Sequence, residues 1–193
     1  MKRSIGAKTV LYPTPVLVVG TYDAQDRPNA TTAAWGGICC SKPPCLSVSF
    51  RAATMAHSNI MARGAFTVSI PSDGYVREVD YFGLVSGRDA DKFEATGLTP
   101  IHSAIVDAPY VGEFPLVLEC RVLHVHELGL HTQFIGEIVD VKVEGECFDE
   151  AGELDAGRVA SFFYAPQDGN YYGKAVRIAK AHSVGRDIKD AAE

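Results

Sequence analysis

Alternating hydrophobic and polar residues predict β-strands along most of this chain. In residues 46–51 (LSVSFR), large apolar residues alternate with serine and arginine, which is the two-residue period of a strand with one buried face. Residues 16–22 (VLVVGTY) are apolar at successive positions, as in a strand that is covered on both faces. The strands predicted by these patterns are residues 16–22, 29–34, 46–51, 65–70, 116–128, 132–144 and 159–164.

Capping residues predict three short helices between the strands. A hydroxyl or carboxyl side chain before a helix can accept from a free backbone N–H group, and a glycine often ends one. The helices are residues 57–63 between Thr54 and Gly64, one from Asp73 toward Gly83, and one from Asp89 or Asp91 to Gly97. Glycines, prolines and charges predict irregular chain at 1–15, 36–45, 98–115 and 145–157. Many strands and few helices predict a mainly β fold, a β-barrel with peripheral short helices.

Length and charge narrow the class of protein. The chain has 193 residues, which fits one domain over residues 1–193 with a peripheral tail at about 180–193. Its net charge of −6, without a Lys/Arg-rich run, argues against a nucleic-acid partner. No apolar run approaches the ~18 residues of a membrane span, and the start, MKRSIGAKTVLYPTP, lacks the apolar region of a signal peptide. We therefore expect a cytoplasmic protein with no membrane partner.

The five cysteines do not form a recognisable framework. They stand at Cys39, Cys40, Cys45, Cys120 and Cys147. An odd number gives no complete set of disulfides, and the spacing is not CxxC. A metal or redox site at the first three cysteines is an alternative, but the spacing favours reduced, structural thiols.

Residues 28–59 combine features that suit a flat, polar-edged ring with an anionic tail. The strand at 29–34 is small and polar, so its backbone N–H and C=O groups stay approachable from outside. Arg51, Thr54 and the start of the following helix can hold a phosphate. The residue types alone are equally compatible with an ordinary β-hairpin and a Gly/Pro loop, because no strict motif is present.

Five segments resemble the flavin reductase-like, FMN-binding split-barrel family, and most closely its flavoredoxin branch. In chain order they are TPVLVVGTYD, PNATTAAWGGICCSKPP, FTVSIPS, YFGLVSGRDADKF and GLHTQFIGEI. The resemblance implies a split barrel that binds FMN, a homodimer with a flavin site at each subunit boundary, and a redox partner protein or NAD(P)H as electron donor. The residues assigned to the cofactor are Asn29, Thr31, Thr32, Ala33, Ala34, Trp35, Ser47, Ser49, Arg51, Thr54, Asn59, Ser86 and Lys92.

His131 is the candidate catalytic residue. At the similar position the family has a Gly-Asp-His sequence, whose histidine lies near the flavin ring and the incoming nicotinamide. This chain has Leu130 in place of the aspartate, as in the GLHT of the flavoredoxin branch, and the departure puts nicotinamide use in doubt. His131 could instead join His124 and His126 in a metal site, since an H-x-H pair in a strand places both imidazoles on one face.

Together these features predict an oxidoreductase-type flavoprotein that carries electrons through bound FMN. One alternative is an NAD(P)H-dependent flavin reductase that supplies reduced flavin to a partner. A second alternative is a non-redox barrel that binds a metal or another ligand. The sequence contains no GxGxxG or GxxxxGK[ST] motif, so a cofactor would be held outside the nucleotide-binding folds that those motifs mark.

Overall fold

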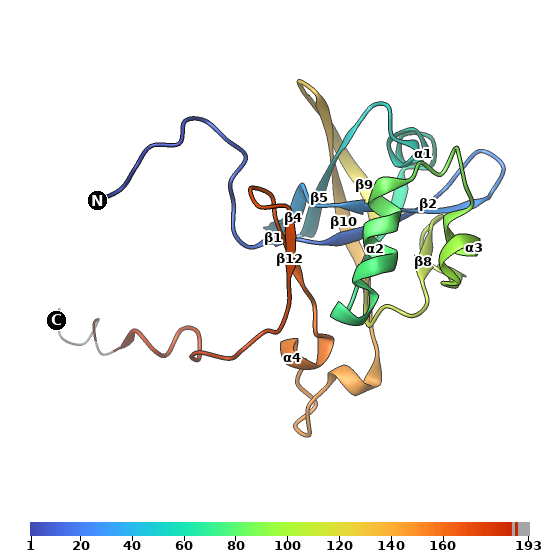
Figure 1. Ribbon diagram of the computed structural model, residues 1–193. Helices are drawn as coiled ribbons and strands as arrows, with labels where there is room; N and C mark the ends of the chain where they lie inside the picture. Colours follow the sequence, from blue (N-terminus) through green and yellow to red (C-terminus); the bar gives the residue numbers. More distant parts are fainter. Residues whose placement is uncertain (187, 189–193) are drawn as a thin grey trace.

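The computed structural model describes residues 1–186 and 188, and their largest sheet has seven antiparallel strands (Figure 1). Neighbouring strands follow the order β3-β2-β6-β9-β10-β5-β4. The strands are β2 (Leu17–Tyr22), β3 (Pro28–Ala33), β4 (Gly36–Ser41), β5 (Pro44–Arg51), β6 (Ala65–Ile70), β9 (Leu116–Leu128) and β10 (His131–Val143). Six of the predicted strands are confirmed to within two residues at each end.

The sheet curls into a barrel because its two edge strands are consecutive in the chain. β3 ends at Ala33, and β4 begins at Gly36 on the opposite edge of the sheet. Between them, the carbonyl of Trp35 accepts a hydrogen bond from the amide of Ser49 in β5, 2.8 Å away. Residues 34 and 35 therefore bridge the two edges, and the predicted mainly β barrel is confirmed.

Short helices and two smaller sheets surround the barrel (Figure 1). Thr54 and Asp91 cap the first and third helices, and Gly64 and Gly97 end them in the left-handed conformation, as predicted. The α-helices are α1 (Met55–Arg63), α2 (Val76–Leu84), α3 (Lys92–Thr96) and α4 (Ala156–Val159), and the 3-10 helices are η1 (Asp73–Tyr75) and η2 (Gly145–Cys147). The remaining strands are β1 (Thr14–Pro15), β7 (Pro100–His102), β8 (Pro109–Val111), β11 (Phe163–Ala165) and β12 (Asn170–Tyr172).

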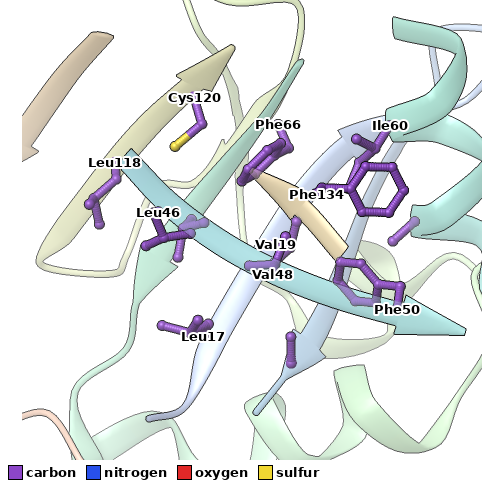
Figure 2. Packing of buried hydrophobic residues seen from close by; sticks show 13 residues of the cluster. Leu17, Val19, Leu46, Val48, Phe50, Ile60, Phe66, Leu118, Cys120 and Phe134 are labelled. Carbon is purple, nitrogen blue, oxygen red and sulfur yellow. The ribbon is translucent and has the colours of Figure 1, made fainter. Parts of the chain in front are cut away.

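Apolar side chains from around the sheet fill the barrel interior (Figure 2). Leu46, Val48 and Phe50 of β5 lie in this cluster, as their alternation predicts. The full cluster is Leu17, Val19, Ala33, Leu46, Val48, Phe50, Ala56, Ile60, Phe66, Val68, Leu118, Cys120 and Phe134. Burial of apolar area contributes about 25 cal/mol per Å², so this cluster is a main source of the barrel's stability.

α2 and α3 cover the outer face of β2 and β3. Val79 and Phe82 of α2 and Phe93 of α3 share a buried cluster with Val18 and Ala30 of these strands. β2 is therefore covered on both faces, which explains its unbroken apolar sequence.

Gly20 allows a second chain segment to cross β2 at close range. A β-carbon at this position would lie 2.0 Å from the backbone oxygen of Pro109, at the start of β8. Thr67 in the adjacent β6 donates its hydroxyl to the same oxygen. The residue at position 20 must therefore lack a side chain.

Three regions predicted as irregular contain paired strands. The first is residues 1–15, in which β1 pairs with β11. The other two each contain a pair of neighbouring strands. Residues 36–45 form β4 and the start of β5, which pair as a hairpin around Lys42 and Pro43. Residues 98–115 include β7 and β8, which pair with each other. Glycines and prolines in both regions mark turns and edge positions rather than unpaired chain.

The strand predicted at 159–164 is wrong in its first part. Asp155 accepts a hydrogen bond from the amide of Gly157 and caps α4, which ends at Val159, and β11 begins only at Phe163.

Residues 180–186 and 188 of the predicted tail are exposed, and the rest of it lies outside the described residues. A single domain over the whole chain stays a prediction. No helix among residues 1–186 and 188 has both the length and the apolarity needed to cross a membrane.

Candidate functional site

A groove follows the outer edge of β3, which forms one edge of the seven-stranded sheet. At the β2–β3 hairpin, the amide of Asp23 donates to the carbonyl of Arg27. Hydrogen-bonded and non-hydrogen-bonded pairs alternate along an antiparallel ladder, and this bond sets the phase of the alternation. Ala30 and Thr32 then belong to non-hydrogen-bonded pairs with β2, so their backbone N–H and C=O groups face away from β2. This edge offers backbone donors and acceptors to a polar ligand.

Two cavities make up the groove and meet at Gly83 and Leu84, at the end of α2. The first has a volume of about 240 Å³ and is called the α1 pocket; it is lined by Thr31, Arg51, Ala53, Thr54, Met55, Phe82, Gly83, Leu84, Val85, Ser86, Gly87 and Lys92. The second has a volume of about 390 Å³ and is called the β3 pocket; it is lined by Val16, Thr32, Ala33, Ala34, Asp80, Gly83, Leu84, Tyr164, Gly169 and Tyr171. The groove thus runs from the start of α1 along β3 toward β11 and β12.

The α1 pocket suits an anion. Thr54 Oγ1 accepts a hydrogen bond from the amide of His57, 3.3 Å away, and donates to the carbonyl of Arg51 at 2.9 Å. The first turn of α1 carries no acidic residue, and its other amides have no acceptor within the helix. The helix dipole and the exposed guanidinium group of Arg51 make this end of the groove positive.

Lys92 brings a second positive charge to the groove from a buried position. Its side chain is 3% exposed, and Nζ donates to the carbonyls of Ala30 at 2.7 Å and Phe82 at 2.8 Å. Among the described residues, no carboxylate lies within ion-pair distance of this ammonium group. Burial lowers the pKa of Lys92 from 10.5 to about 8. An anion in the adjoining pocket would therefore stabilise the charged form of this lysine.

Asn29 lies behind the groove and orients the hydroxyl of Thr31, which lines the α1 pocket. Its side chain is 3% exposed, and Nδ2 donates to Oγ1 of Thr31 at 3.2 Å. Oδ1 of Asn29 has no partner within the part of the chain that is described, and Gly87 packs against it so closely that a β-carbon there would lie 2.1 Å away. Because Thr31 accepts from Asn29, its own hydroxyl hydrogen can point to a ligand in the α1 pocket.

The two pockets bring together eight of the predicted cofactor residues. Thr31, Arg51, Thr54, Ser86 and Lys92 line the α1 pocket, and Thr32, Ala33 and Ala34 line the β3 pocket. The hydroxyl of Thr32 donates to the carbonyl of Val79 in α2, so this residue offers its backbone rather than its side chain.

Asn59 is a buried residue of α1 and does not line the α1 pocket. It is 6% exposed, and its Nδ2 donates to Oγ1 of Thr21 in β2 at 3.0 Å. The position is on the helix face that packs against the barrel, so its amide helps to fix α1 on β2.

Trp35, Ser47 and Ser49 lie around the β4–β5 hairpin, outside the two pockets. Ser47 Oγ donates to the carbonyl of Gly37 in β4 at 3.4 Å, and Trp35 is about one-third exposed. The backbone hydrogen bond from Ser49 to Trp35 ties the hairpin to the bridge between β3 and β4, whereas Ser47 bonds within the hairpin.

His131 is the first residue of β10 and lies directly opposite Arg51 of β5 in the strand register. Arg51 lines the α1 pocket, whereas His131 lies beside it and does not line that pocket. In β9, His124 and His126 stack with their ring centroids 6.0 Å apart. Within residues 1–186 and 188, the structure contains no group of three or more side chains placed to hold a metal ion.

Arg88 is a candidate that the sequence analysis missed. Its Nη1 donates to the carbonyl of Ala53 at 2.6 Å and its Nη2 to Oγ of Ser58 at 3.3 Å, so it lies over the start of α1. It stands in the same SGRDADKF segment as Lys92, and this shared segment was the available signal.

Tyr171 lies in the groove and is paired there with Asp80. Its hydroxyl donates to Oδ1 of Asp80 at 2.9 Å, and both residues line the β3 pocket. Burial, with the hydrogen bond to Asp80, raises the pKa of Tyr171 well above its ordinary value. No local pattern pairs these positions, because β12 and α2 are far apart in the chain.

Comparison with known proteins gives consistent matches over nearly all of this fold. The sequence model of the flavin reductase like domain matches residues 9–162. The flavoredoxin of Desulfovibrio vulgaris (Miyazaki F) is 52% identical, with a TM-score of 0.92 over 96% of this chain and 100% of that chain. The flavoredoxin from Methanosarcina acetivorans is 26% identical, with a TM-score of 0.89 over 97% and 99%. An FMN-binding protein from Thermus thermophilus is 27% identical, with a TM-score of 0.78 over 93% and 100%. The split-barrel fold and the resemblance to flavoredoxin are thereby confirmed.

Proposed function

The chain belongs to the flavin reductase like domain family, and from this membership we propose that it is a flavoprotein that binds FMN in the groove beside β3 and carries electrons through it. The observation that carries the proposal is the groove itself, which joins an open strand edge to a cationic pocket at a helix start. Bound FMN would supply reversible uptake and release of electrons. The protein supplies position, charge and exclusion of water.

The phosphate of FMN is assigned to the α1 pocket. Arg51 can donate charge-assisted hydrogen bonds there, and Met55, at the start of α1, and Ser86 line the same cavity. Arg88 adds positive charge over the start of the helix. A phosphate group matches this donor set because it is an anion with several acceptor oxygens.

The ring system is assigned to the edge of β3 and the β3 pocket. The outward backbone groups of Thr32 can pair with the polar edge of a ring, while Leu84 and Tyr164 offer apolar surface in the same pocket. The ammonium group of Lys92 lines the adjoining α1 pocket, fixed on the carbonyls of Ala30 and Phe82, and its positive charge would stabilise negative charge on a reduced ring. This charge would favour the reduced state of the ligand over the oxidised state.

A homodimer is part of the proposal, and the β9–β10 hairpin supports it. The hairpin extends beyond the barrel (Figure 1), and apolar side chains on its outer half are exposed, as at Leu123, Leu128 and Leu130. Exposed apolar side chains gathered on one projecting element are typical of an interface. Light scattering on the purified protein is expected to give twice the chain mass, and a monomer at micromolar concentration would contradict the homodimer.

The visible spectrum of the purified protein tests the proposed function. We expect a yellow protein that keeps FMN through gel filtration, bleaches on reduction with dithionite and regains its colour in air. A protein that stays colourless after incubation with FMN would contradict the proposal. Steady-state NADH oxidation with excess free flavin then separates the alternatives: a carrier turns over nicotinamide poorly, whereas an NAD(P)H-dependent reductase, with His131 beside Arg51 at the groove, would turn it over with released flavin as product.

A further inference from the structure

The end of the β4–β5 hairpin holds three of the five cysteines. Cys39 and Cys40 of β4 are exposed, and Cys45 of β5 is buried. Cys40 lies directly opposite Cys45 in the strand register, whereas the register shift between Ile38 and Cys40 leaves Cys39 without an opposite residue. The pairing was not visible in the sequence, because residues 36–45 were expected to be irregular.

The register places Cys40 and Cys45 at a separation that a disulfide can span. Directly opposed residues of antiparallel strands have Cα atoms about 4.5–5.5 Å apart, and disulfides join Cα atoms about 4.4–6.8 Å apart. The Cys45 thiol also contacts the carbonyl of Pro43, with Sγ 3.4 Å from the oxygen, so it is held at the turn next to Cys40. A bond between the two sulfurs would therefore need rotation of side chains and little movement of the strands.

We propose that Cys40 and Cys45 are a thiol–disulfide site, which forms a reversible disulfide by exchange with a low-molecular-weight disulfide such as glutathione disulfide. Neither cysteine lines the α1 pocket or the β3 pocket, so the site is separate from the proposed flavin groove. The inference does not depend on the proposed function.

The two cysteines have different roles in the exchange. The thiolate of the exposed Cys40 attacks one sulfur of the small disulfide, whose S–S bond breaks and releases one small thiol, leaving a mixed disulfide on Cys40. Cys45 then gives up its proton to solvent and attacks Sγ of Cys40, which releases the second small thiol. The two protein thiols lose two electrons in total, and the small disulfide gains them.

The difference in burial between Cys40 and Cys45 sets the order in which the two thiols react. Burial raises the pKa of the Cys45 thiol, and the neighbouring Cys40 and Cys39 sulfurs raise it further. The exposed Cys40 therefore meets the small disulfide first, and Cys45 acts as the resolving thiol. Cys120 and Cys147 are buried elsewhere and are expected to keep their thiols.

Thiol counting and peptide mass spectrometry in denaturant, after incubation with glutathione disulfide, test the proposal on the full chain as purified. Of the five thiols in the wild-type protein, those of Cys40 and Cys45 should be found joined in one disulfide that carries no glutathionyl mass, while the exposed Cys39 can carry a glutathionyl group of its own. Dithiothreitol should restore all five. Five thiols retained under excess glutathione disulfide, or a disulfide that links two chains on a non-reducing gel, would overturn the proposal.

Three variants assign the bond to its residues. Cys39→Ser is the matched control, because Cys39 is adjacent and also exposed, and this variant should still lose two thiols. Cys40→Ser, at an exposed position that does not endanger folding, should form no disulfide within the chain, and a thiol lost at Cys39 should appear as glutathionyl mass. Cys45→Ala should carry a glutathionyl group on Cys40 in place of the disulfide. A disulfide within the chain of Cys45→Ala would mean a bond between Cys39 and Cys40, and would contradict the assignment.

Discussion

The ammonium group of Lys92 lies 2.7 Å from the carbonyl oxygen of Ala30, on the edge of β3 that faces away from β2. A charge held there without a carboxylate partner within the described residues costs stability, since burial lowers its pKa from 10.5 to about 8. The stability of the fold should therefore depend on pH through Lys92, a residue that lines the proposed ligand groove.

The flavin-free protein should become more stable, relative to Lys92→Met, as the pH rises from about 8 to 10.5. In this window the folded state has released the Lys92 proton while the unfolded state still binds it, so the free energy of unfolding rises with pH. The full gain is up to about 3 kcal/mol, at about 1.36 kcal/mol per pKa unit. Urea unfolding at several pH values measures it. Lys42→Met, at an exposed lysine, should keep the wild-type pH profile, and parallel profiles for wild type and Lys92→Met would contradict the buried charge.

Arg51→Ala should weaken FMN binding. The loss of charge-assisted hydrogen bonds to the phosphate is expected to cost about 1.5–3 kcal/mol, which raises Kd roughly 10- to 150-fold. Quenching of flavin fluorescence in a titration of flavin-free protein measures the change. Arg77→Ala removes an exposed arginine of α2 that lines neither pocket and should leave Kd unchanged. Equal Kd values for wild type and Arg51→Ala would remove Arg51 from the site.

Thr54→Ala should lower both helix stability and FMN affinity. The side chain caps α1 by accepting from the amide of His57, and loss of such a cap costs about 1 kcal/mol of folding free energy. The affinity falls because the first turn of α1 lines the phosphate end of the groove. Thr54→Ser keeps the hydroxyl and should retain most of both properties, as measured by thermal unfolding and the same flavin titration. If Thr54→Ala has the thermal stability and the FMN affinity of the wild type, the Thr54 cap contributes to neither property.

Gly20→Ala should destabilise the barrel without touching the groove. The added β-carbon would meet the backbone oxygen of Pro109, which a rotamer change cannot move, so the strands must shift at a cost of roughly 1–3 kcal/mol. Gly145→Ala is the matched control, because a β-carbon there meets nothing within 4 Å. Chemical denaturation compares the two variants. Similar stability for both would show that β8 does not press on β2.

The strands could be predicted from the sequence where burial imposes a clear period. Alternation in β5 and the continuous apolar run of β2 reflect one buried face and two buried faces, respectively. The hairpin of β4 was missed because Ile38, Cys39 and Cys40 at an exposed edge show no such period. Short edge strands are held by backbone pairing, which leaves little trace in side-chain type.

The site could be predicted in part, because local chemistry marks one end of it. Arg51 and Thr54 stand beside a helix start, where sequence and anion binding are directly linked. Asn59 and Lys92 show the limit of such reasoning: both are polar residues in or beside helices, but tertiary packing buries both and gives their donors to protein acceptors. Which face of a short helix packs on the barrel depends on distant strands, so residue type alone cannot settle it.

A crystal structure of the protein with FMN tests the central claim most directly. The account predicts the phosphate in the α1 pocket, within hydrogen-bond distance of Arg51 and the first-turn amides of α1, and the ring along the outer edge of β3 toward Ala34. FMN bound at another surface, or a phosphate remote from Arg51 and the start of α1, would contradict it.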